Sequence, residues 1–582
     1  MSYTIEIDDT RDNLLTDFGK ATLSDRYTLP GESYQQLFAR VACKYSDNVA
    51  HAQRLYDYLS RHWFMAATPI LSNGGTSRGL PISCFLNEAS DTLRGIVSLW
   101  EENVWLASGG GGIGSYWGNL RGLGEAVGNR GSTCGIIPFI KVMDSMTLAI
   151  SQGSLRRGSA AVYLPISHPE IEEFIDVRRP TGGDPNRRSL NLHNAVVIDD
   201  SFMGCVRDNT DYALRSPKDG AVIRHVNARN LWAKLLTSRI ETGEPYIMFG
   251  DTVNRLAPDV YKANGLKIKT SNLCIEIMLA TGKDHHDRER TAVCCLSSVN
   301  LEYYDSWSKS PHFIEDVVRF LDNVLQDFID NAPDTMAKAK YAAMRERSIG
   351  LGAMGFHSYL QKRMLPFEGP LAKSANLRMF NHIKEKCDVA NEVLSKEKGA
   401  CPDAKDAGIN KRFCNITSIA PTASISVIAG TTSPSIDPWT ANVFTQKTIS
   451  GSFMVYNPHL KALLASRGHD TQETWSKIIR HEGSVQELGF LSDDEKEVFK
   501  TALEINPYWL IEHGADRTPF IDQSQSLNLW LPANVSKSDL HNVHYLAWKK
   551  GVKSLYYCRS TTIQSAEKIS KQVKYEECLS CS

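Results

Sequence analysis

NAVVID, residues 194–199, is the first of four short β-type runs that decide the fold class of this chain. It is followed by EPYIMFG (244–250), SSVNL (297–301) and NITSIAP (415–421), with helical stretches between them. Strands that alternate with helices are typical of parallel sheets, because each helix carries the chain back to the edge where the next strand starts. The sequence therefore predicts an α/β body whose strands are mostly parallel and could close into a barrel.

Helical stretches flank this alternating region. Residues 1–65 have the apolar spacing of helices, and residues 455–520 are helical and charged. A long amphipathic helix is expected over residues 91–108, with Asp91 as its N-cap. Eleven glycines between positions 109 and 135 predict loops rather than regular elements.

The composition is that of an ordinary globular protein, with 42% hydrophobic and 23% charged residues. The balance of 65 basic against 66 acidic residues argues against a nucleic-acid or membrane surface. No apolar run reaches the ~18 residues that span a bilayer, and the polar N-terminus is unlike a signal peptide. Thirteen scattered cysteines without structural-zinc spacing predict reduced thiols in a cytoplasmic protein, and no bound metal.

The stretch NLCIE places an amide, a thiol and a carboxylate at alternate positions: Asn272, Cys274 and Glu276. In an extended segment these three side chains project from one face. On a helix the same spacing would scatter them. We therefore expect an extended segment whose three polar groups surround one small substrate.

Seven motifs together, in this order, resemble the large, catalytic (alpha) subunit of a class I ribonucleoside-diphosphate reductase. They are ATPI (67–70), SC (83–84), NLCIE (272–276), CCLSSVNL (294–301), PTASIS (421–426), LYY (555–557) and the terminal CLSC (578–581). The resemblance implies a ten-stranded α/β barrel of two antiparallel halves, each of five parallel strands, with the central cysteine on a loop through its middle. It divides the chain into a helical N-terminal region (1–65), the catalytic barrel (66–559, with effector elements over 88–160) and a flexible redox-active tail (560–582).

The resemblance assigns the chemistry, which is reduction of ribonucleoside diphosphates to deoxyribonucleotides for DNA synthesis. Cys274 matches the transient thiyl radical that takes the 3′-hydrogen of the ribose. Glu276 matches the base at the 3′-hydroxyl, since a base must lie within about 2.6–3.2 Å of its proton. Asn272 would bind the sugar hydroxyls and orient Glu276.

The other cysteines in these motifs match the thiols that supply electrons in the family. Cys84 and Cys294 match a pair that closes to a disulfide during turnover. The adjacent Cys295 is the alternative to Cys294, and in a strand only one of the two faces the substrate. Cys578 and Cys581 match a shuttle pair on the tail, which an external thioredoxin- or glutaredoxin-type reductant would regenerate.

Tyr556 and Tyr557 imply the class, because the chain has no obvious radical generator. The pair would relay an electron and a proton between Cys274 and a metal-containing small (beta) subunit. Strict strand alternation would part the two rings, so the relay requires a local irregularity.

The resemblance also implies two nucleotide sites. The substrate diphosphate would lie in a cradle formed by residues Thr68, Ser83, Thr422, Ala423, Ser424, Ile425 and Ser426. A deoxynucleotide or ATP effector, bound with Mg²⁺, would lie beside the interface of a homodimer. Its predicted residues are Asp91, Arg121, Gln152, Arg156 and Arg157.

One departure from the family concerns its N-terminal ATP-cone domain, for which there is no room before residue 15. We therefore expect a short form, as in phages or in bacteria whose reductases lack the cone. Two other functions remain open. An adenosylcobalamin-dependent reductase shares the cysteines but does not need Tyr556 and Tyr557. A non-catalytic nucleotide-binding homologue would not need the redox thiols.

Overall fold

The computed structural model describes residues 3–82, 84–129, 131–152, 156–180, 182–448, 451–532 and 534–560. Its centre is a sheet of five parallel strands, in the order β2-β3-β6-β7-β10. These strands are β2 (Cys84–Glu88), β3 (Gly112–Tyr116), β6 (Ser159–Pro165), β7 (His193–Ile198) and β10 (Tyr246–Phe249). One antiparallel strand borders each side, β13 (Ala292–Cys294) on β2 and β19 (Ser554–Leu555) on β10.

The chain continues from β13 into a second set of parallel strands. β14 (Leu296–Asn300) pairs in parallel with β15 (Gly350–Met354), and β18 (Leu529–Leu531) pairs in parallel with β20 (Cys558–Ser560). Parallel bridges Leu351–Thr417 and Ile419–Gln525 connect these two pairs. The predicted barrel of two antiparallel halves is therefore confirmed, and the antiparallel pairs β2/β13 and β10/β19 are its two seams.

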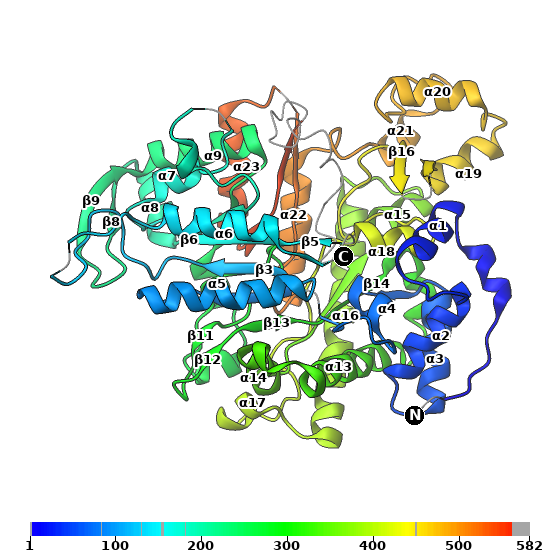
Figure 1. The fold of residues 1–582 in the computed structure, drawn as a ribbon. Helices are drawn as coiled ribbons and strands as arrows, with labels where there is room; N and C mark the ends of the chain where they lie inside the picture. The colour runs from blue at the N-terminus through cyan, green and yellow to red at the C-terminus, as the bar shows by residue number, and fades with distance from the viewer. Residues whose placement is uncertain are drawn as a thin grey trace.

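Helices cover the outside of the barrel and form a lobe at its N-terminal side (Figure 1). The N-terminal helices are α1 (Asp17–Arg26), α2 (Tyr34–Lys44) and α3 (Val49–Ser60), as the apolar spacing predicts. The short helix α4 (Thr68–Asn73) follows strand β1 (Phe64–Ala66).

The remaining helices and strands connect or flank the barrel strands. The helices are α7 (Ile171–Ile175), α8 (Asp200–Asp208), α9 (Ala228–Thr242), α10 (Gly250–Arg255), α11 (Asp259–Ala263), α12 (Tyr304–Trp307), α13 (Phe313–Asn331), α14 (Ala337–Glu346), α15 (Phe356–Lys362), α16 (Pro370–Lys398), α17 (Pro402–Asp406), α18 (Ala423–Ile428), α22 (Pro507–Arg517) and α23 (Lys537–Lys549). The strands form three hairpins: β4 (Ser151–Gln152) with β5 (Arg156–Arg157), β8 (Asp211–Arg215) with β9 (Val222–Asn227), and β11 (Gly282–Lys283) with β12 (Glu289–Arg290).

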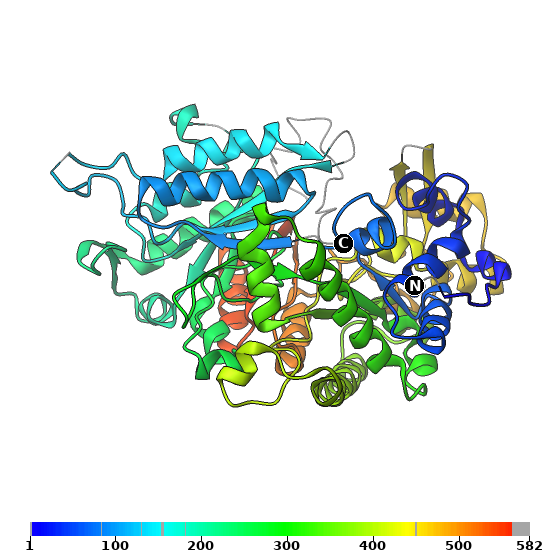
Figure 2. The same ribbon diagram turned by 60° about the horizontal axis from the view of Figure 1, so that its bottom comes forward.

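The long helix expected over residues 91–108 is α5 (Leu93–Ser108), and it lies beside α6 (Ile137–Ala149) at the surface (Figure 2). The prediction of Asp91 as its N-cap is wrong. The hydroxyl of Thr92 accepts the hydrogen bond from the backbone N–H of Gly95, and Asp91 instead binds Arg121. The side chain of an N-cap residue bonds the N–H group two or three positions further along, and Thr92 is the residue at that position before α5.

The expectation that residues 109–135 lack regular elements is also wrong, because β3 lies within them. Gly114 of β3 has a structural reason to be glycine. A Cβ atom there would lie 1.8 Å from the carbonyl oxygen of Ser271. Glycine in a strand commonly marks such a close approach of another backbone.

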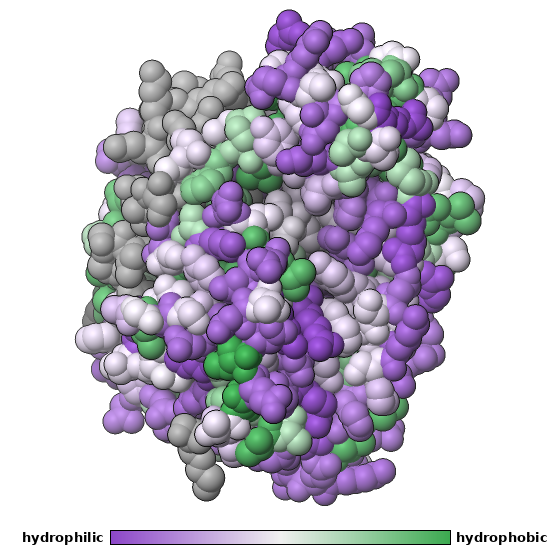
Figure 3. Space-filling model, turned by 90° about the vertical axis from the view of Figure 1, so that its right-hand side faces the viewer, coloured by the Kyte–Doolittle hydropathy of each residue, from purple (hydrophilic) through white to green (hydrophobic). Residues whose placement is uncertain are grey.

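A separate small lobe covers residues 443–499. It consists of β16 (Val443–Thr448), β17 (Gly451–Tyr456), α19 (Pro458–Ser466), α20 (Gln472–Arg480) and α21 (Asp493–Val498). Its apolar side chains form a second core, distinct from that of the barrel. The face formed by this lobe and the N-terminal helices is mainly hydrophilic (Figure 3). None of the helices in the described ranges is both long and apolar enough to cross a bilayer.

Candidate active site

The segment NLCIE lies inside the barrel, but it is not extended as predicted. Residues 273–275 form a turn, with Ile275 in the left-handed region at φ 63°. Asn272, Cys274 and Glu276 are fully buried. Left-handed backbone is unfavourable for a β-branched residue, so surrounding contacts must hold the turn in place.

Hydrogen bonds from three serines on other segments hold this turn. The hydroxyl of Ser554 donates to the carbonyl of Ile275 (3.0 Å), and that of Ser418 donates to the carbonyl of Glu276 (2.9 Å). Ser526 Oγ lies 2.6 Å from the carbonyl oxygen of Cys274 and 3.0 Å from Glu276 Oε2. The turn brings Asn272 Nδ2 within 2.9 Å of Glu276 Oε1, so the amide and the carboxylate meet although the backbone is not a strand.

Two thiols face each other across the β2/β13 seam. Cys84 and Cys294 are directly opposite in the antiparallel register, and both are buried. Opposite residues of antiparallel strands have Cα atoms about 4.5–5.5 Å apart, which lies within the range a disulfide needs. Asn272 Nδ2 lies 3.5 Å from the sulfur of Cys84, so the pair adjoins the turn. Cys295 Sγ lies instead 3.6 Å from the carbonyl oxygen of Leu321 on α13.

Three tyrosines meet beside Cys274 at the other seam. The hydroxyl of Tyr556 donates to Cys274 Sγ at 3.4 Å. The strand breaks at Tyr556 and Tyr557, between β19 and β20, and this irregularity leaves the two ring centroids 4.2 Å apart. The buried ring of Tyr246 lies 4.7 Å from Tyr556 and 5.1 Å from Tyr557. Burial, with a smaller effect of nearby Glu244, raises the pKa values of Tyr246 and Tyr557, so both phenols keep their protons.

The predicted phosphate cradle lines a pocket next to the N-terminal helices. Ala423, Ser424 and Ser426 of α18 border it together with Phe18 and Thr22 of α1. Two other members of the predicted set are engaged in bonds to the protein. The hydroxyl of Thr422 accepts from the N–H of Ser435 (2.6 Å), and that of Thr68 pairs with the Tyr27 hydroxyl (2.9 Å). Ile425 is buried, and Ser83 lies outside the described residues.

The predicted effector residues lie in two separate places. Asp91 and Arg121 form an ion pair (2.7 Å) at the N-terminal end of α5. The backbone of Gln152, Arg156 and Arg157 forms the hairpin β4–β5. This hairpin lies toward the other end of α5, since a Cβ atom on adjacent Gly158 would lie 3.6 Å from the Cβ of Ala107. Because α5 has 16 residues and is about 24 Å long, one protomer does not bring the two groups together.

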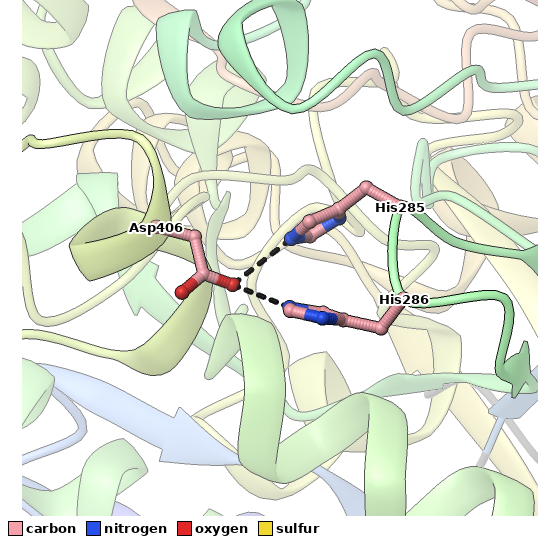
Figure 4. Close-up of side chains that lie close together, drawn as sticks. All are labelled: His285, His286 and Asp406. Atoms are coloured by element: carbon pink, nitrogen blue, oxygen red, sulfur yellow. Dashed lines mark hydrogen bonds and ion pairs between the residues drawn. The ribbon is translucent and has the colours of Figure 1, made fainter.

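One group of side chains in the described part of the chain has the composition of a metal site: His285, His286 and Asp406 (Figure 4). It lies on the surface between hairpin β11–β12 and helix α17. Arg345 Nη2 is within 3.3 Å of His285 Nε2 and 3.1 Å of His286 Nε2, and the guanidinium also pairs with Asp406. The guanidinium therefore takes the place of a cation, and we assign no metal to this group.

Two positions near the turn, Tyr246 and Ser526, were missed by the sequence reasoning. Tyr246 sits in the predicted strand EPYIMFG, where an aromatic residue is ordinary, so no local signal marked it. Ser526 follows Ser524 at a strand-like spacing of two, and both serines touch the turn. The alternation of these two serines is the sequence signal that could have identified Ser526. Cys578 and Cys581 fall in the undescribed C-terminal segment.

Comparison with known proteins places this geometry in a family. Residues 82–412 and 404–558 match the ribonucleotide reductase barrel domain, and residues 13–79 match the ribonucleotide reductase all-alpha domain. The chain therefore belongs to the ribonucleotide reductase large-subunit family.

Individual relatives cover nearly the whole chain. The ribonucleoside-diphosphate reductase large subunit of Invertebrate iridescent virus 3 is 41% identical, with 97% of each chain covered. That of Caenorhabditis elegans is 31% identical, with 94% of this chain and 76% of its own length covered. The solved class Id ribonucleotide reductase alpha subunit of Actinobacillus ureae is 33% identical with a TM-score of 0.83, covering 94% of this chain and 98% of its own.

Proposed function

We propose that this chain is the catalytic subunit of a class I reductase that converts ribonucleoside diphosphates to 2′-deoxyribonucleoside diphosphates in the cytoplasm. One observation carries the proposal: the Tyr556 hydroxyl donates to the sulfur of buried Cys274, two residues from Glu276. A phenol in contact with a thiol can exchange a hydrogen atom with it. A nucleotide-binding protein without catalysis would not need this contact.

The side chains around the turn divide the reaction between them. Cys274, as a thiyl radical, takes the 3′-hydrogen of the ribose, and Glu276 takes the proton of the 3′-hydroxyl. The 2′-hydroxyl then leaves as water, with a proton from the Cys84–Cys294 pair. That pair supplies two electrons and, with its second proton, the new hydrogen on the 2′-carbon, and it closes to a disulfide. Glu276 returns its proton to the 3′-oxygen, and Cys274 returns the hydrogen to the 3′-carbon. Asn272 binds both Glu276 and Cys84, so it orients the base next to the reductant.

The radical and the final electrons come from partners in this proposal. A metal-containing small subunit supplies the oxidising equivalent through Tyr557 and Tyr556. Cys578 and Cys581 of the tail reduce the internal disulfide, and a thioredoxin- or glutaredoxin-type dithiol reduces the tail. The contact between the two tyrosine rings supports the first step, because an adenosylcobalamin-dependent enzyme would not require it.

We further propose a homodimer that builds the effector site. Leu93, Val97 and Trp105 of α5 are exposed, as is Val142 of neighbouring α6. Such an apolar stripe on adjacent helices is suited to packing against a second copy. If two α5 helices pair antiparallel, the Asp91–Arg121 end of one protomer meets the β4–β5 hairpin of the other. A dATP-type or ATP effector with Mg²⁺ would bind there.

The test is reduction of CDP to dCDP with dithiothreitol and an effector, adding either a radical-bearing small subunit or adenosylcobalamin. We expect turnover with the small subunit alone, and none in Cys274→Ser, which should still bind nucleotide. Turnover with adenosylcobalamin alone would instead establish the cobalamin class. Nucleotide binding without turnover in any mixture would support a non-catalytic homologue.

A further inference from the structure

The outer end of the tyrosine cluster touches a histidine that the reaction above does not use. His193, the first residue of β7, stacks on Tyr246 with 5.9 Å between ring centroids and an angle of 17°. The same imidazole lies edge to face with Tyr557, at 6.1 Å. It thus contacts two of the three clustered phenols.

A buried carboxylate fixes this histidine. Nδ1 of His193 is 2.6 Å from Glu244 Oε1, and the other oxygen of Glu244 accepts from the N–H of Asn194 (3.0 Å) and pairs with Arg178 (3.3 Å). Glu244 is 1% exposed. Arg178 and His193 outweigh its burial and hold the pKa of Glu244 below its usual value, so it is a carboxylate at working pH. A carboxylate at Nδ1 makes that nitrogen the N–H, which leaves the lone pair on Nε2.

Oxidation of a tyrosine needs a proton acceptor of this kind. Removing one electron from a phenol makes its O–H strongly acidic, so the proton must leave as the electron does. In the described part of the chain, Tyr557 makes ring or cation contacts with Tyr246, Tyr556, His193 and Arg559. Arginine is always protonated, and a neutral phenol is a very weak base. His193 is the member of this set that offers a basic nitrogen with a lone pair, Nε2.

We propose that His193, held by Glu244, accepts the phenolic proton of Tyr557 when the partner subunit removes an electron from that residue. This rests on the proposed function. Tyr557–OH and neutral His193 become the neutral tyrosyl radical and imidazolium, and the radical centre of the small subunit gains the electron. Tyr557 then takes a hydrogen atom, an electron with its proton, from Tyr556. His193 keeps its proton until the radical returns and Tyr557 regains its electron from the small subunit.

The charges around His193 suit a transient cation. Glu244 lies against it and compensates the imidazolium. Two cations lie nearby, and each contacts a neighbour of His193. Arg178 is bound to the far oxygen of Glu244, and Arg559 lies over the ring of Tyr557 at 4.5 Å. Tyr246 is a positioning residue here, because its ring contacts the imidazole and both rings of the tyrosine pair.

The experiment compares His193→Phe, which keeps a ring but removes the base, with His225→Phe, an exposed histidine on β9. Both are assayed with the small subunit for CDP reduction. We expect kcat of His193→Phe to fall at least about tenfold, as general base catalysis contributes about 10²–10⁴, with the KM for CDP and effector binding unchanged. His225→Phe should match the wild type.

A second measurement separates proton transfer from packing. A polyfluorinated tyrosine at position 557 has a more acidic phenol than tyrosine, so its oxidation depends less on a neighbouring base. It should restore turnover in His193→Phe toward that of the same fluorotyrosine protein with His193 intact. If the phenylalanine variant does not fold, His193→Gln is compared in the same way.

The outcomes distinguish this inference from the proposed function. Wild-type kcat in His193→Phe, or a loss that the fluorotyrosine does not restore, would overturn the role of His193 alone. No CDP reduction by the wild-type pair would overturn the proposed function, and the inference with it.

Discussion

Ser526 supports two groups of the active site with one hydroxyl. Its Oγ lies 2.6 Å from the carbonyl of Cys274 and 3.0 Å from the carboxylate of Glu276. We expect Ser526→Ala to lower kcat for CDP about tenfold or more, because a hydrogen bond to a charged group contributes about 1.5–3 kcal/mol. Steady-state kinetics with the small subunit measures this.

The control for that variant is Ser395→Ala on α16, which also loses a side-chain hydrogen bond, to Asn410. It should leave kcat unchanged. Equal losses in the two variants would mean that Ser526 acts only on stability and not on the orientation of Glu276.

Glu346 is a buried acid outside the active site whose ionisation should control stability. Burial raises its pKa from 4.5 to about 7, although Arg290 and a hydrogen bond from Tyr261 oppose the shift. The folded state therefore binds the proton more tightly than the unfolded state. Protonated Glu346 therefore adds to the free energy of unfolding. This contribution is at most about 3 kcal/mol; it is complete below pH 4.5 and is lost as the pH rises to 7.

Glu346→Gln removes this titration, since glutamine stays neutral at every pH. We expect the wild type to lose stability relative to the variant between pH 5 and 8. Denaturant unfolding at several pH values measures the difference, and Glu392→Gln at an exposed position of α16 is the control. A constant difference across this range would show that Glu346 does not titrate there.

At the level of elements, strand β3 determines how closely the turn can approach the sheet. Gly114→Ala would place a methyl group 1.8 Å from the carbonyl oxygen of Ser271, and backbone cannot yield as a flexible side chain does. We expect loss of CDP reduction and a lower melting temperature. Gly204→Ala in α8 has no atom within 4 Å of the added carbon, and it should be neutral or slightly stabilising. A fully active Gly114→Ala protein would contradict the close packing.

The same elements show what sequence could predict. Ordered motifs predicted the barrel, and the alternation of short strands with helices predicted its parallel halves. Strand β3 was missed because its glycines have the composition of a loop. What places Gly114 in a strand is the backbone of Ser271, which is 157 positions away along the printed chain.

The turn at Cys274 and the break at Tyr556 were beyond local reasoning for a related reason. Ile275 has a left-handed backbone because serines at 418, 526 and 554 hold the carbonyls around it. The tyrosine pair leaves the strand because β19 pairs with β10 while β20 pairs with β18. The local sequence around Ile275 and Tyr556 does not indicate which distant serines or strands these segments will contact.

For the whole molecule, the two seams of the barrel separate reduction from oxidation. The β2/β13 seam holds Cys84 opposite Cys294, and the β10/β19 seam holds Tyr246 next to Tyr556. The turn with Cys274 lies between them, bonded to the first seam through Asn272 and to the second through Tyr556. In the proposed reaction the radical enters at one seam and the electron pair is supplied from the other.

The apolar stripe on α5 gives a prediction about assembly. Val97 is 48% exposed in the middle of that stripe. Val97→Glu would put a charge, and its copy, into an antiparallel pair of α5 helices, where burial of like charges is costly. We expect light scattering to show a dimer for the wild type and a monomer for Val97→Glu. Val389→Glu changes an exposed valine on helix α16 outside the stripe, and this variant should remain dimeric.

Because the effector residues of one protomer lie at opposite ends of α5, the same substitution should also abolish regulation. The Val97→Glu monomer should keep the barrel and its thiols, yet its preference among nucleoside diphosphates should no longer change when effectors are exchanged. Substrate competition assays with each effector measure this. A monomer that still responds to effectors would show that the Asp91–Arg121 end binds nucleotide without the β4–β5 hairpin of a second copy, and the dimeric effector site would be wrong.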